Sequence, residues 1–174
     1  MSPVLLLLTF GIIDFARALY FYVTIDAAAR DLARYASQAA GDSTVSGVTA
    51  WKSAAKDGDV LSLAGVRMPG LVVTAPPCVN GPLSATSPSI GTAYVYITNV
   101  NPGTTALHPP PEPNAPGGEL PATPSGCSDV VPASGNSRLQ VTIVYNYAPV
   151  TPLVGSVIGN HLLLQAGSVA RAES

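Results

Sequence analysis

Two histidines and one short acidic motif are the residues best suited to catalysis or metal binding. His108 is followed by three prolines, His161 lies at the edge of an expected strand, and neither has an acid partner at a spacing that would build a catalytic triad. Asp57 and Asp59 flank a glycine without further oxygen ligands at calcium-loop spacing, so a turn is expected there. The sequence therefore predicts no enzyme, no cofactor and no metal site.

The two cysteines, Cys78 and Cys127, lie on either side of a Pro-rich segment. In an oxidising compartment we expect one disulfide between them, while in a cytosolic domain they would be two buried thiols. We prefer the disulfide because the N-terminus is apolar. Closing a loop of about 50 residues would add roughly 4 kcal/mol by the chain-entropy estimate.

The composition argues against a nucleic-acid partner. Only 10% of the 174 residues are charged, the formal net charge is -2, and the eight basic residues form no cluster along the chain. A protein that neutralises phosphates needs a basic stripe, so we exclude nucleic acid. The length suits one domain plus an anchor.

A single long helix is expected over residues 3–40. Residues 3–23 are apolar nearly all round, and residues 24–40 are amphipathic. At 1.5 Å per residue this helix would be about 57 Å long, longer than a simple membrane span. One apolar stripe at three- and four-residue spacing marks its second half: Ile25, Ala28, Ala29, Leu32, Ala36 and Ala39.

The remaining residues, 41–174, are expected to form an extracytoplasmic α+β head: a small antiparallel sheet packed on the amphipathic half of the helix, in a pilin-like arrangement. A short helix is expected over residues 45–57, anchored by Trp51. Residues 101–136 are too Pro-rich for a helix or strand and are expected to form a long loop. The four expected strands are Leu71 to Ala75, Ala93 to Thr98, Arg138 to Tyr147 and Leu162 to Ala172.

Asp14 and Arg17 interrupt the apolar half of the long helix, and three interpretations stay open. The pair could bond within the helix inside a span that ends near Val23, at a cost of about 2.5–3.5 kcal/mol per charge before pairing. Residues upstream of Met1 could complete a span that ends near Ile13, with Asp14 and Arg17 at the interface. A signal peptide could be cut after Ala18. We prefer the second, because it explains the charges and keeps the helix whole.

Two segments of the chain resemble a known family. "PVLLLLTFGIIDFARALY" followed by "IDAAARDLARYAS" is similar to the start of TadE-like proteins, the pseudopilins of tight-adherence (Tad) pilus systems. The closing segment from residue 138 to 173 resembles the end of the same family. Family members resemble type IV prepilins, which carry a glutamate near the mature N-terminus, whereas this sequence has none before Glu112.

The resemblance implies a structural pilin or pseudopilin subunit of a Tad-type pilus, with a role in adhesion or pilus biogenesis. Its implied partners are other pilin subunits, the inner membrane before assembly and the assembly machinery, and its final location is the cell surface. Asp14 and Arg17 are then either a register device for assembly or only an interfacial pair, and the loop at 101–136 is either a contact surface or a spacer. The residues expected to face the membrane or the filament core are Leu5, Leu6, Leu7, Leu8, Phe10, Ile12, Ile13 and Phe15. The alternative is a membrane-anchored extracytoplasmic binding domain that never enters a filament.

Overall fold

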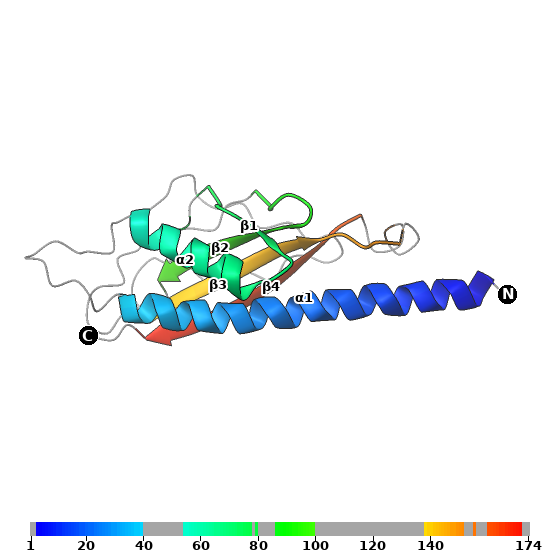
Figure 1. The fold of residues 1–174 in the computed structure, drawn as a ribbon, viewed down its shortest axis with the longest axis horizontal. Helices are drawn as coiled ribbons and strands as arrows, with labels where there is room; N and C mark the ends of the chain where they lie inside the picture. The colour runs from blue at the N-terminus through cyan, green and yellow to red at the C-terminus, as the bar shows by residue number, and fades with distance from the viewer. Residues whose placement is uncertain are drawn as a thin grey trace, which may run out of the picture.

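The computed structural model describes residues 3–39, 54–77, 79, 86–99, 138–151, 155 and 160–171. Within these ranges the chain forms two helices and a four-stranded sheet, in the order α1, α2, β1, β2, β3, β4. Both helices pack on the same face of the sheet (Figure 1). The expected α+β class is confirmed.

Helix α1 runs from Pro3 to Ala39, 37 residues without a break, and confirms the single helix expected over residues 3–40. The sheet covers only its C-terminal half, so the N-terminal part extends beyond the strands (Figure 1). At 1.5 Å per residue the helix is about 55 Å long. This length lets one element serve both as part of the head's core and as a projecting apolar rod.

The sheet is mixed, which corrects the expectation of an antiparallel one. Its strands are β1 (Val72–Thr74), β2 (Thr92–Asn99), β3 (Arg138–Tyr147) and β4 (Leu162–Arg171), in the spatial order β1-β2-β3-β4. The β2–β3 and β3–β4 pairs are antiparallel, but β1 runs parallel to β2. A parallel pair needs a crossover of a dozen or more residues, and the chain between β1 and β2 is long enough to provide one.

Helix α2 lies later in the chain than expected. It spans Ala54–Arg67, whereas the sequence predicted a helix over residues 45–57, and residues 45–53 with Trp51 lie outside the described residues. The turn expected at Asp57 and Asp59 is wrong, because both residues lie inside this helix. The signal that decides the position is an apolar series at four-residue spacing, Val60, Ala64 and Met68, all fully buried.

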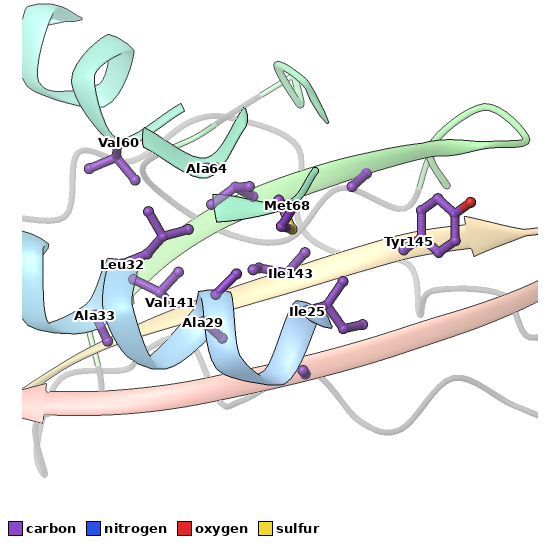
Figure 2. Close-up of a cluster of buried hydrophobic side chains, with 14 of the residues drawn as sticks. Ile25, Ala29, Leu32, Ala33, Val60, Ala64, Met68, Val141, Ile143 and Tyr145 are labelled. Carbon is purple, nitrogen blue, oxygen red and sulfur yellow. The ribbon is translucent and has the colours of Figure 1, made fainter. Parts of the chain in front are cut away.

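The core lies between the two helices and the sheet. In Figure 2, side chains from α1, α2 and β3 point into one shared space, with Leu32, Val141 and Met68 among them. The predicted stripe on α1 is confirmed for every member whose burial is described: Ile25, Ala28, Ala29, Leu32 and Ala36. Because three of these five residues are alanines, the helix can approach the sheet closely.

Strand β3 is the central strand and is buried on both faces. Its predicted apolar alternation, from Leu139 to Tyr147, is confirmed, since those side chains join the main core. Its other face is also buried: Thr142 is fully buried, and Val144 packs with Tyr96 in a second cluster. The strand therefore holds the chain that follows it, residues 148–151, in a fixed position beside α1.

Candidate assembly helix and its Asp14 anchor

The N-terminal half of α1 presents a continuous apolar surface. The eight residues expected to face a membrane or a filament core are all exposed by 48–70%: Leu5, Leu6, Leu7, Leu8, Phe10, Ile12, Ile13 and Phe15. Soluble monomers rarely expose apolar surface of this extent, and such surfaces mark contact with protein or lipid. The arrangement can therefore bind a bilayer or other apolar helices.

One helix in the described part of the chain is long and apolar enough to cross a membrane. The segment is Leu5–Ser37, and an 18-residue window of it with a mean hydropathy of 1.6 is only 6% buried inside the fold. From Ile25 onward the apolar stripe cannot face lipid in this fold, because Ile25, Leu32 and Ala36 are buried in the core. The exposed large apolar side chains that could contact a membrane lie between Leu5 and Val23.

Asp14 lies at the junction of the two halves and is 97% buried, with 3% of its surface exposed. Its Oδ1 accepts a hydrogen bond from the Val150 amide at 3.0 Å, and its Oδ2 accepts one from the Thr151 amide at 3.0 Å. The Thr151 hydroxyl also donates to Oδ2. One carboxylate thus binds three donors of the segment after β3, and hydrogen bonds to an ionised acceptor are the strong ones.

A fourth hydrogen bond joins the same helical turn to the end of β3. The Tyr147 hydroxyl donates to the backbone carbonyl of Asp14 at 3.1 Å. Burial raises the pKa of Tyr147, and the nearby Asp14 carboxylate raises it further, so the hydroxyl stays protonated as a donor. The head therefore binds both the side chain and the backbone carbonyl of Asp14 on α1.

The helical period explains why Asp14 reaches the head. Ala18, Phe21 and Ile25 follow it at spacings of four, three and four residues, and all three pack against the core. Asp14 continues this stripe toward the N-terminus. There it lies beside Val150 and Thr151, which follow β3 and whose backbone amides no longer belong to the sheet. A carboxylate at this position satisfies those amides, which an apolar residue would leave unpaired.

Arg17 does not bond to Asp14 in the way the intrahelical interpretation required. No Asp14–Arg17 salt bridge occurs among the residues that the structure describes. Arg17 is exposed, and its guanidinium carbon lies 6.0 Å from the centroid of the Phe21 ring. Phe21 packs in turn on Tyr145 and Tyr147, with ring centroids 5.2 and 5.9 Å apart. A cation over an aromatic face is a favourable arrangement.

The anchor places Asp14 outside a membrane interior. A span centred on Asp14 would carry residues 148–151 and their polar backbone into the hydrocarbon, where unpaired amides and carbonyls are costly. A cut after Ala18 would remove Asp14 from the head that it ties down. The helix leaves the head at Asp14, and N-terminal to it the large apolar side chains from Leu5 to Ile13 are exposed.

Several sequence predictions fall outside the described residues. Cys78 and Cys127 are among them, so their disulfide stays a prediction, and so are His108 and the Pro-rich segment 101–136. The sequence analysis missed Tyr147, Val150 and Thr151 as partners of Asp14. They lie 133 to 137 positions away, and two of the four bonds come from backbone amides that carry no sequence signal.

Comparison with known families tests the resemblance directly. Residues 1–34 match the family model of TadE-like proteins. The match covers the exposed apolar half of α1, the Asp14 anchor and the start of the buried stripe, and it associates the chain with Tad pilus systems. Neither the curated proteins nor the solved structures gave a match to this chain. The TadE-like helix and its apolar surface are consistent with membrane anchoring.

Proposed function

We propose that this chain is a structural, non-enzymatic pilin or pseudopilin subunit of a Tad-type pilus that assembles through the N-terminal half of α1. The observation that carries the proposal is the combination of a TadE-like helix with eight large apolar side chains exposed on its N-terminal part, seven of them beyond the Asp14 anchor and Phe15 beside it. On this account the inner membrane covers that surface before assembly, and neighbouring subunits cover it in a filament at the cell surface.

The energetics support burial by several neighbours at once. Full burial of a large apolar side chain contributes about 1.5–3 kcal/mol, so a half-exposed one has about 1 kcal/mol still to gain. Eight such residues give on the order of 10 kcal/mol, comparable to the entropic cost of association. Such a surface binds firmly only when most of its circumference is covered, as in a membrane or a bundle of helices.

Asp14 and Arg17 take different roles in this proposal. The Asp14 carboxylate already has three donors within its own subunit, so it fixes the head on the helix rather than seeking a charge on a neighbour. Arg17 is exposed on the next turn and is the charged side chain available for a contact between subunits. The two residues together set where the helix leaves the head and where a neighbour begins.

The test compares two matched substitutions in the native host. Leu8→Asn changes an apolar residue that is 59% exposed on the assembly surface, and Val66→Asn changes one that is 73% exposed on α2. We expect Leu8→Asn to lower the amount of the chain in sheared filaments at least about tenfold while the membrane level holds, because each polar group buried without a partner costs about 1–3 kcal/mol in every subunit contact. Val66→Asn should leave both levels unchanged.

Two results would contradict the proposal. If the unaltered chain occurs in membranes and never in the sheared fraction, it is an anchored binding domain instead. If Leu8→Asn and Val66→Asn enter filaments equally well, the N-terminal half of α1 is not the assembly surface.

A further inference from the structure

Four of the chain's eight basic residues, which are scattered in the sequence, gather at one end of the head. Arg30 and Arg34 lie on the last turns of α1, and Arg171 ends β4. Arg138 is the cross-strand partner of Arg171. Figure 1 shows the end of α1 and the end of β4 at the same end of the molecule, opposite the N-terminus. The fold thus brings together arginines that lie far apart in the sequence.

An open groove of about 490 Å³ lies between α1 and β4 at this end. Arg30, Arg34 and Arg171 contribute to its lining. Its volume is within the range of ligand-binding sites, about 300–1,000 Å³. No carboxylate of the described residues pairs with Arg34, whereas Arg30 is bound to Asp26 at 2.6 Å. Arg34 is therefore the guanidinium best placed to receive an anion.

The groove also carries oxygen acceptors and hydroxyls. Ser37, Ser168 and Asp31 line it beside the arginines. The Ser37 hydroxyl donates to the Arg34 carbonyl at 2.8 Å, which leaves its oxygen free to accept, and Asp31 contacts Arg67 at 3.5 Å. Guanidinium groups match carboxylate, sulfate or phosphate oxygens, while the serines and Asp31 suit the hydroxyls of a ligand. A ligand that carries both anionic groups and many hydroxyls uses the whole lining.

The position of the groove disfavours the headgroups of the anchoring membrane. Arg30 and Arg34 come 16 and 20 residues after Asp14, which is about 24–30 Å along the helix axis. That distance exceeds the screening length of about 8–10 Å at physiological salt, so the groove acts on ligands beyond the membrane surface.

We propose that the groove between α1 and β4 binds an acidic polysaccharide, with Arg34 holding its anionic groups. This site works in a filament subunit and in an anchored head alike, because it lies on the part of the chain that folds around the core. It does not depend on the proposed assembly function.

The experiment titrates the full chain, held in neutral detergent micelles, with polygalacturonate. Dextran serves as the uncharged polymer, and inorganic phosphate and micelles that contain phosphatidylglycerol serve as other sources of anions. The variants are Arg34→Gln and the charge-retaining Arg34→Lys. Lys56→Gln, on α2, removes the same unit charge as a control. An unchanged urea midpoint shows that each variant is folded.

We expect polygalacturonate to bind and dextran not to bind. Arg34→Gln should weaken binding at least about tenfold, since hydrogen bonds between charged groups are the strong ones. Arg34→Lys should recover less than half of that loss, because lysine lacks the planar fork. Lys56→Gln should change the affinity less than about twofold.

Four results would overturn the proposal. These are no binding of polygalacturonate, equal weakening by Lys56→Gln and Arg34→Gln, binding of dextran, and Arg34-dependent binding of the anionic micelles or of phosphate in place of the polymer. The third and fourth would assign the groove to neutral sugars or to lipid and free phosphate.

Discussion

The two halves of α1 belong to one unbroken helix but meet different surroundings. In the C-terminal half, Ile25, Leu32 and Ala36 are fully buried on the sheet. In the N-terminal half, Leu8 and Ile12 are 59% and 60% exposed. The change occurs at Asp14, whose carboxylate accepts hydrogen bonds from the head. The difference shows that helix propensity and hydrophobicity alone do not divide the chain, and that one buried carboxylate marks the boundary.

The largest expected effect on stability separates the two halves directly. Leu32→Ala should lower the free energy of unfolding of the head by about 3 kcal/mol, because it leaves a cavity in a fully buried site. Leu8→Ala should change it by less than about 0.5 kcal/mol, as exposed positions usually do. Urea unfolding of both variants in detergent gives the comparison. Equal losses would mean that the N-terminal half is part of the head's core.

The boundary itself should give the next largest effect. Asp14→Ala should destabilise the head by about 2 kcal/mol, since it removes the acceptor of the part-buried hydrogen bonds from the Val150 and Thr151 amides. Amide hydrogen exchange should accelerate at those two residues before it does in β2. The control is Asp26→Ala, which removes an exposed i,i+4 pair with Arg30 and should cost less than about 0.5 kcal/mol. If exchange at Val150 is unchanged, Asp14 does not hold the head.

Thr151→Val sharpens the account of that anchor. It keeps the backbone amide and the β-branched shape but removes the hydroxyl that donates to Asp14. We expect a loss of about 1 kcal/mol, the net contribution of one such hydrogen bond. Thr74→Val, on the short strand β1, provides a control with the same change of side chain. A larger loss at Thr74 would show that the effect is not specific to the anchor.

The smallest effect is a dependence on alkaline pH. Because the pKa of Tyr147 is raised in the folded state, its contribution to stability is fully present below the unfolded pKa of about 10 and is lost as pH rises through the folded value. Tyr147→Phe should cost about 1 kcal/mol at neutral pH and show a shallower loss of stability above pH 10. Burial also raises the pKa of Tyr145, so a residual alkaline slope should remain in the variant. Identical slopes in both proteins would contradict the bond from Tyr147 to Asp14.

The sequence predicted those features whose pattern lies within a single helix or strand. The single helix, the buried stripe and the alternation of β3 are periodic patterns within one element, and they were predicted. The predicted position of the second helix was wrong. Gly58 between two aspartates suggested a turn, but the apolar series Val60, Ala64 and Met68 carried the stronger helical signal. The parallel pairing of β1 depends on a crossover, which local patterns do not encode.

The partners of Asp14 and the basic groove show the same limit. No local sequence pattern marks these features, because each brings together residues more than 130 positions apart. Asp14 meets the amides of Val150 and Thr151, and Arg34 and Arg171 line the same groove. A buried carboxylate in an apolar helix did indicate that some partner must exist. Its identity required the packed structure.

The measurement that tests the central claim most directly is photo-crosslinking from Ile12 in the native host. This side chain is 60% exposed and lies on the half of α1 beyond the anchor. The account predicts lipid adducts from the membrane fraction and protein adducts, to a second copy or another pilus subunit, from sheared filaments. Lipid adducts alone, with no chain in the filament fraction, would contradict it.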